Sequence, residues 1–299
     1  MVREAHPKEK AFYAYKGVLK LVFGYAYSKH IISSNPVQTL QNRPYLKSCD
    51  TSKANPEEKI FSKDEIDCLI SEVRSRMNHK KWGEYYINGY AMLFAIETGV
   101  RAGELCALKW SDIHKDVIHI HTQQLVRKLN KKKTYYYSNW TKNEKGISNE
   151  GRYFPLTNKI SALLSEIKEK QEKYGIQSEF IFCHEDGDWI KVEAYETFLR
   201  RLCKSKGLNA TNNHTFRMSL NSNVFIPSGM DVATRAALLG HSIQTNLKYY
   251  SFAQKDHVEN AREILDSINN DALRTPKGPH NIISFSEKEK PQSTNLSVL

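Results

Sequence analysis

Residues 85–105 read YYINGYAMLFAIETGVRAGEL, and this stretch predicts the centre of the fold. Tyr85–Glu97 is apolar on nearly all sides, which is typical of a helix buried inside a domain. Gly99 is expected to end that helix, and a second helix is expected over Ala102–Lys109. The sequence therefore predicts a domain whose core is built around a fully buried helix.

The flanking segments predict a mainly helical domain with a small sheet. Ser62 and Glu65 have the spacing of a capping box, which marks the first helix of a domain that starts near Phe61. Alternating apolar residues and Tyr- and Thr-rich composition predict three strands. We therefore expect a mainly α (α+β) fold with a small three-stranded antiparallel sheet. The expected strands are Val117–Gln123, Thr134–Trp140 and Arg152–Leu156, and the later helices are Asn158–Tyr174, Glu193–Lys206, Asn213–Phe225, Asp231–Leu239, Thr245–Tyr250 and Gln254–Asn269.

The two ends of the chain differ in composition from this domain. Pro7–Ile31 follows helical spacing and stops at Asn35-Pro36. The residues after it are polar and contain proline, which is typical of a linker. The last residues have no apolar period and are expected to be disordered. The predicted organisation is a helical segment over 1–36, a linker over 37–60, a main domain over 61–269 and a tail over 270–299.

The charge of the chain indicates a polyanionic partner. Its 299 residues include 44 Lys and Arg against 33 Asp and Glu, a formal net charge of +11. Such a surplus favours nucleic acid or an acidic membrane surface. No stretch reaches the roughly 18 apolar residues of a membrane span, and no apolar signal segment follows MVREAHPKEK. We therefore expect a cytoplasmic protein with no membrane association.

Five short strings follow one another along the predicted main domain. They are Thr98–Leu105 with Leu108–Ile113, Thr141–Lys145 followed by a turn and Arg152–Leu156, His214–Arg217, Leu238–Ser242 and Tyr249–Ser251. In this order they resemble the tyrosine recombinase family of phage and conjugative-transposon integrases. The resemblance covers residues 61–269 and extends loosely to residues 10–36, which are similar to part of the family's core-binding domain.

The resemblance implies a site and an assembly. The implied catalytic residues are Arg101, Lys142, His214, Arg217, His241 and a tyrosine, with Glu104 as a supporting residue. It also implies a nucleoid-associated protein of bacterial or phage type that binds double-stranded DNA at recombination sites as a homotetramer. In the family, the helix after the nucleophile docks on a neighbouring protomer. Here that helix is Gln254–Asn269, and packing within its own subunit is the alternative.

The same residue types suit attack on a phosphodiester. Two guanidiniums, Arg101 and Arg217, can grip the non-bridging oxygens and stabilise the charge that develops on phosphorus. His214 and His241 can donate hydrogen bonds or shuttle a proton near neutral pH. Lys142 can protonate the departing 5′ oxygen. No carboxylate cluster suited to Mg²⁺ accompanies the set, so we expect a metal-free reaction without cofactors.

Two adjacent tyrosines are candidates for the nucleophile. Nearby cations favour the phenolate form, and the covalent phosphotyrosine conserves bond energy, so religation needs no ATP. Tyr249 and Tyr250 point about 100° apart on a helix. The family commonly has Tyr, then a small residue, then His, and Tyr250-Ser251-Phe252 matches this apart from Phe252. Tyr250 is the preferred nucleophile and Tyr249 the alternative.

Glu104 and the lysine run at 131–133 each have a functional interpretation and a purely structural one. Glu104 lies three residues after Arg101 and can orient its guanidinium, although such a pair alone is typical of a solvated surface ion pair. The run Lys131, Lys132 and Lys133 is expected either to contact DNA phosphates or to form a solvated surface.

The leading hypothesis is a site-specific recombinase that cleaves one strand at a time through a 3′-phosphotyrosine and religates through a Holliday junction. The first alternative is a truncated DNA-binding remnant of an integrase without recombination activity. A second is a topoisomerase-like enzyme with the same chemistry and no site specificity.

Overall fold

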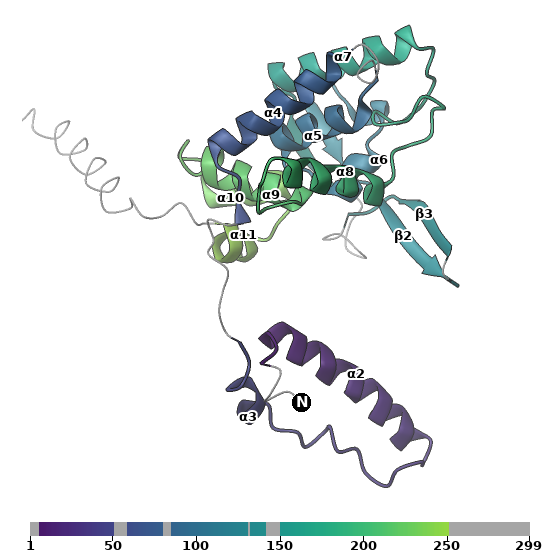
Figure 1. Cartoon of the computed structure of the whole chain (residues 1–299), viewed down its shortest axis with the longest axis vertical. Coiled ribbons are helices and arrows are strands. Elements are labelled where there is room, and N and C mark those ends of the chain that lie inside the picture. The colour runs from purple at the N-terminus through teal and green to yellow at the C-terminus, as the bar shows by residue number, and fades with distance from the viewer. Residues whose placement is uncertain (1–5, 51–58, 80–84, 131, 142–149, 251–299) are drawn as a thin grey trace, which may run out of the picture. The chain divides into compact units, whose positions relative to one another are not determined.

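The computed structural model describes residues 6–50, 59–79, 85–130, 132–141 and 150–250 (Figure 1). Its centre is helix α5 (Ile87–Thr98), which is buried at nearly every position. The helix contacts α4 (Lys63–Met77), α7 (Asn158–Lys173), α8 (Val192–Ser205) and α9 (Asn213–Leu220). An apolar helix of this kind needs protein on every side, and the prediction of a fully buried helix is confirmed.

Local signals mark the start of this domain. Ser62 Oγ accepts from the Glu65 amide at 3.2 Å, and Glu65 Oε2 accepts from the Ser62 amide at 2.8 Å, so the predicted capping box is confirmed. The Phe61 amide donates to Ser219 Oγ at 2.7 Å, and Asn223 Nδ2 donates to the Phe61 carbonyl at 2.7 Å. These contacts attach the first residues of the domain to α9 and to the π-helical turn η3 (Asn221–Phe225).

The strands confirm the α+β class, but their pairing differs from the single three-stranded sheet that we predicted. Within the described residues, β1 (Val117–Ile120) pairs antiparallel with β4 (Arg152–Pro155), and β2 (Gln123–Leu129) pairs antiparallel with β3 (Lys132–Ser138). Strand β2 was missed because QQLVRKL shows no clean alternation of apolar and polar residues. The register places Arg152 opposite Ile120.

The N-terminal segment consists of α2 (Glu9–Ser28) and the short helix α3 (Arg43–Leu46). Residues 37–50, which we predicted as the start of a linker, return along α2. The rings of Phe12 and Tyr45 stack at 6.0 Å, and Lys16 Nζ donates to the Leu40 carbonyl at 3.2 Å. Sequence composition could not reveal these contacts because they depend on the reversal of the chain after α2. Among the described helices, none has the length and apolar character that crossing a membrane requires.

Candidate active site

The buried carboxylate of Glu104 binds arginines from three different segments. Glu104 lies on α6 (Ala102–Ala107), and its side chain is 1% exposed. Arg101 Nη1 donates to Oε1 at 2.7 Å. Arg152, the first residue of β4, donates from Nη1 to Oε1 at 3.1 Å and from Nη2 to Oε2 at 2.6 Å. Arg217 Nη2, from α9, lies 3.5 Å from Oε2. One carboxylate therefore positions three guanidiniums.

The three cations also decide the ionisation of Glu104. Burial by itself raises the pKa of a carboxyl group, because it disfavours the charged form. The charges and hydrogen bonds of Arg152, followed by the charges of Arg217 and Arg101, outweigh burial and hold the pKa of Glu104 well below its usual range. The group is thus an anion, and the cluster has three positive charges against one negative charge, a net of +2.

The same three arginines bind the C-terminal end of α10 (Val232–Leu239). Arg152 Nε donates to the Leu238 carbonyl at 3.0 Å, and Arg101 Nη2 donates to the Gly240 carbonyl at 2.8 Å. Between them, Arg217 Nη1 donates to the carbonyl of residue 239 at 2.5 Å. The last carbonyls of a helix have no partner within the helix and carry partial negative charge. The arginines satisfy them and fix the backbone directly before His241.

His241 lies against this cluster in its neutral form. Its Nε2 is 3.1 Å from Arg217 Nη1. Because a guanidinium can only donate, Nε2 must accept, which leaves the ring proton on Nδ1. Burial, followed by the charges of Arg217, Arg101, His214 and Arg152, lowers the pKa of His241 to about 3.

Arg217 is fully buried where α5 and α9 approach each other. Its Nε donates to the Gly99 carbonyl at 2.7 Å. Gly99 ends α5 with a φ of +60°, and a Cβ there would lie 3.2 Å from Arg217 Cα. A side chain at this position would be strained in φ and crowded by backbone. The predicted helix end at Gly99 is confirmed: the left-handed glycine caps α5, and the close approach of α9 leaves no room for a larger residue.

Arg101 and His214 line a pocket of 340 Å³ beside this cluster. Arg101 remains 22% exposed, and His214 is exposed at the start of α9. Asn213, another lining residue, donates to the Val100 carbonyl at 2.7 Å and accepts from Tyr195 Oη at 2.8 Å. The Gln124 side-chain amide donates to the Ile190 carbonyl at 3.0 Å and accepts from the Val192 amide, at the start of α8, at 2.8 Å. Val192 and the carboxylate Glu196 also line the pocket, and Arg101 is the lining cation that can bind the oxygens of a phosphate group.

The structure brings four of the predicted site residues together and places a fifth beside them. Arg101, Glu104, Arg217 and His241 are in direct contact, and His214 lines the adjoining pocket. Lys142 and Lys131 lie outside the described residues. Tyr249 and Tyr250 end helix α11 (Ile243–Tyr250), and their side chains are likewise outside what the structure describes.

Sequence reasoning assigned no role to Arg152, although it touches Glu104 and α10. The available signal was an arginine opening the strand after the loop that contains Lys142. The sequence predicts that Glu104 orients Arg101, and the structure adds Arg152 and Arg217 as partners. The 1% side-chain exposure of Glu104 rules out the solvated surface pair that we considered as an alternative.

Lys132 and Lys133 lie at the turn end of the β2–β3 hairpin, opposite Leu129 and Lys128, and the hairpin projects from the helices in Figure 1. Lys132 and Lys133 are exposed, and Lys133 Nζ contacts Glu193 Oε2 at 2.6 Å. Tyr135 Oη donates to the same carboxylate oxygen at 3.0 Å. Glu193 therefore forms an ion pair with Lys133, one of the lysines predicted to contact DNA.

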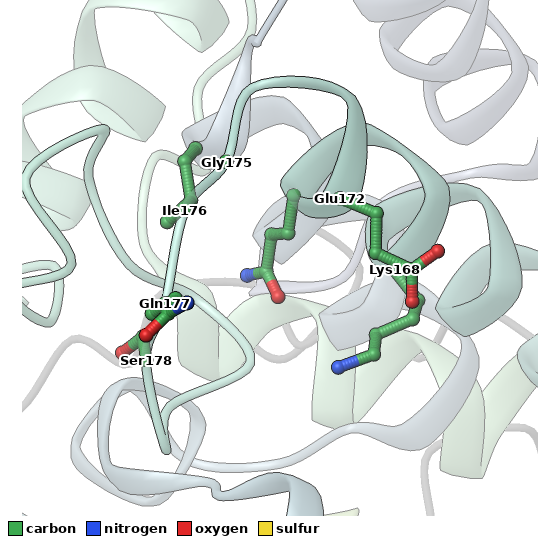
Figure 2. A pocket seen from close by; sticks show the side chains of 7 residues that line it. Lys168, Glu172, Gly175, Ile176, Gln177 and Ser178 are labelled. Carbon is green, nitrogen blue, oxygen red and sulfur yellow. The ribbon is translucent and has the colours of Figure 1, made fainter.

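A separate pocket of 430 Å³ lies at the C-terminal end of α7 (Figure 2). Lys168 and Glu172 line it from the helix, and residues 175–178 line it from the segment that follows. It contains none of the predicted site residues. No group of three His, Cys, Asp or Glu side chains suited to a metal ion occurs within the described ranges.

The chain matches the model of the phage integrase family over residues 59–257. It is 24% identical over 279 residues to a protein named tyrosine recombinase XerC-like from Caldanaerobacter subterraneus, covering 87% of this chain and 66% of that protein. It is 24% identical over 259 residues to the ICEBs1 integrase of Bacillus subtilis, covering 84% and 63%. The chain thus spans less than two thirds of the length of these curated relatives.

Solved structures share the fold. The Tn1549 transposon integrase, solved in complex with transposon right end DNA, superposes with a TM-score of 0.64 at 21% identity, covering 88% of this chain and 81% of that chain. A lambda integrase dimer bound to a COC′ core site gives a TM-score of 0.52 at 18% identity, covering 80% and 58%. At these identities the likeness shows the fold alone.

Proposed function

Because the chain belongs to the phage integrase family of tyrosine recombinases, we propose that it is a site-specific DNA recombinase acting through a covalent 3′-phosphotyrosine, without metal or ATP. The observation that carries this proposal is the pocket in which Arg101 and His214 lie beside a buried cluster of net charge +2. A phosphodiester repels nucleophiles because its oxygens are negative. Fixed cations offset that charge and stabilise the additional charge of the transition state.

The roles follow from the position of each group. Arg101 and His214 donate to the non-bridging oxygens of the scissile phosphate in the pocket. Arg217, which is buried, keeps the field positive and holds His241. The phenol oxygen of Tyr250 attacks phosphorus, its proton passes to His214, and the bond to the 5′ oxygen breaks as Lys142 protonates that oxygen. Attack by a 5′ hydroxyl of the partner strand reverses these transfers and restores the phosphodiester.

The assembly is part of the same proposal. We expect four copies to bind two recombination sites, with the basic N-terminal segment and the β2–β3 hairpin contacting double-stranded DNA. Net charge of +11 supports a polyanionic partner. Mass photometry of the protein with nicked duplexes should show a four-copy complex that is absent without DNA.

A trapping experiment tests the chemistry. The protein is incubated, with a chelator, with a pool of nicked duplexes from which the short fragment bearing the new 5′ hydroxyl diffuses away. Covalent complexes are then isolated under denaturing conditions. Wild-type protein and Tyr249→Phe should form adducts through a 3′-phosphotyrosine, and Tyr250→Phe should not. Adducts that survive in Tyr250→Phe and vanish in Tyr249→Phe would transfer the nucleophile's role to Tyr249.

Other outcomes reject the proposal. DNA binding without any adduct would favour the non-recombining DNA-binding remnant. Relaxation of supercoiled plasmids that lack any shared sequence would favour the topoisomerase-like alternative.

A further inference from the structure

We propose that Arg152 is a positioning residue of the active site, which locks Glu104 and the C-terminal end of α10 into one unit and thereby aims Arg101 and His241. This inference rests on the function proposed above. Arg152 lies outside the predicted catalytic set. It is on strand β4, whereas Glu104 and Arg217 are on helices α6 and α9.

The first support is the geometry of its guanidinium. Arg152 donates to both oxygens of Glu104, at 3.1 and 2.6 Å, and to the Leu238 carbonyl at 3.0 Å. Its side chain is 9% exposed. All three of its nitrogens thus point at protein groups, so its effect on the reaction must pass through the groups that it holds.

The second support is the tight fit of Arg152 against Gly240. A Cβ on Gly240 would lie 3.0 Å from Arg152 Nη1 and 3.1 Å from Arg152 Cδ. The guanidinium therefore packs directly on the backbone before His241. Because Arg101 binds the Gly240 carbonyl at 2.8 Å, movement of this turn would displace Arg101 and His241 together.

The third support is charge. Arg152 supplies the largest favourable interaction that keeps Glu104 ionised. Without it, the same carboxylate would be shared by Arg101 and Arg217 alone, and the cluster would fall from a net charge of +2 to +1. Arg101 would then be drawn more strongly toward Glu104 and away from the pocket.

Two substitutions and a matched control test this role. Arg152→Met removes charge and hydrogen bonds, whereas Arg152→Lys keeps the charge and loses the two-point geometry. The control is Arg74→Met, because Arg74 also contacts both oxygens of a glutamate, Glu166, at 2.9 and 2.8 Å, but joins α4 to α7. Each variant is assayed for adduct formation on nicked DNA and for DNA affinity, at a temperature where its melting curve shows it folded.

Misplaced catalytic groups slow the chemical step while leaving binding intact. We expect adduct formation to fall about 100-fold in Arg152→Met and about 10-fold in Arg152→Lys, with DNA affinity within about twofold of wild type. Arg74→Met should change neither quantity by more than about twofold. Wild-type cleavage by both Arg152 variants, or parallel loss of binding and cleavage, would overturn the proposal.

A second readout needs no DNA. The carboxyl carbon of Glu104, assigned by its loss in Glu104→Gln, is followed by ¹³C NMR as the pH is lowered. Glu104 should stay ionised in the wild type while other glutamates titrate, and its pKa should rise in Arg152→Met, where Arg101 and Arg217 remain. An unchanged titration would refute the role of Arg152. Absence of adducts in the wild type would instead count against the proposed function, and the titration would still decide on Arg152.

Discussion

Glu104 and Arg152 lie 48 residues apart and form a two-point ion pair with contacts of 3.1 and 2.6 Å. Both side chains are nearly or fully buried. A buried charge is costly unless it is paired and hydrogen-bonded. Here the carboxylate contacts three guanidiniums, each of which also donates to a backbone carbonyl, and the cluster keeps a net charge of +2.

Replacing Glu104 by Gln should change how the free energy of unfolding depends on pH. The depressed pKa means that the contribution of ionised Glu104 is fully present above its unfolded value of 4.5 and is lost as pH falls toward the lower folded value. At neutral pH we expect Glu104→Gln to lose about 3–5 kcal/mol of unfolding free energy, because three guanidiniums lose their shared anion and two of them, Arg152 and Arg217, are buried. Urea unfolding should show the gap to wild type narrowing below pH 4.5, and parallel curves would contradict the assignment.

Replacing Gly99 by Ala should be more damaging than the same change at another left-handed glycine. Gly207 has a φ of +70° with open space around it, whereas Gly99 has a φ of +60° with Arg217 Cα 3.2 Å from the position of a Cβ. Gly207→Ala should cost about 1–2 kcal/mol from backbone strain alone. Gly99→Ala should cost more in urea unfolding and also reduce adduct formation. Equal losses in the two variants would show that the close approach is unimportant.

The hairpin lysines should contribute to the salt dependence of DNA binding. If Lys132 and Lys133 each contact one phosphate, each Ala substitution should reduce the slope of log affinity against log salt by about 0.9. Glu193→Gln should raise DNA affinity, because that carboxylate binds Lys133 at 2.6 Å in the free protein. Lys173→Ala on α7 is the control and should leave the slope unchanged. An unaltered slope in the hairpin variants would indicate that these lysines stay solvated and do not contact DNA phosphates.

Replacing Arg101 by Lys should separate charge from geometry in the pocket. Lys keeps the cation but cannot bind the Glu104 carboxylate, the Gly240 carbonyl and a phosphate at once, as the guanidinium can. Loss of one such stabilising donor typically costs about 100- to 1,000-fold in rate. Single-turnover cleavage should fall by that factor while DNA affinity changes little. A wild-type rate would exclude Arg101 from the reacting centre.

The elements predicted best were those with short-range signals. The Ser62–Glu65 capping box, the apolar run of α5 and the glycine stop at residue 99 are each readable within a few residues, and all are confirmed. Strand β2 had no such signal, and its omission made the predicted sheet wrong in pairing. The polar composition of residues 37–50 predicts a linker, and their contacts with α2 could not be predicted because those partners are distant in the sequence.

By itself, the sequence determined which residues are available for phosphoryl chemistry, the order in which they occur and the helices that carry them, because these depend on residue type and local periodicity. Only the tertiary structure decided that Glu104 is shared by three arginines, that Arg152 is one of them, and that all three grip the last carbonyls of α10. Apart from the Arg101–Glu104 pair, which is three positions apart, those contacts join residues 22 to 139 positions apart. They arise from the angles at which helices and strands pack, and no local pattern in the chain encodes those angles.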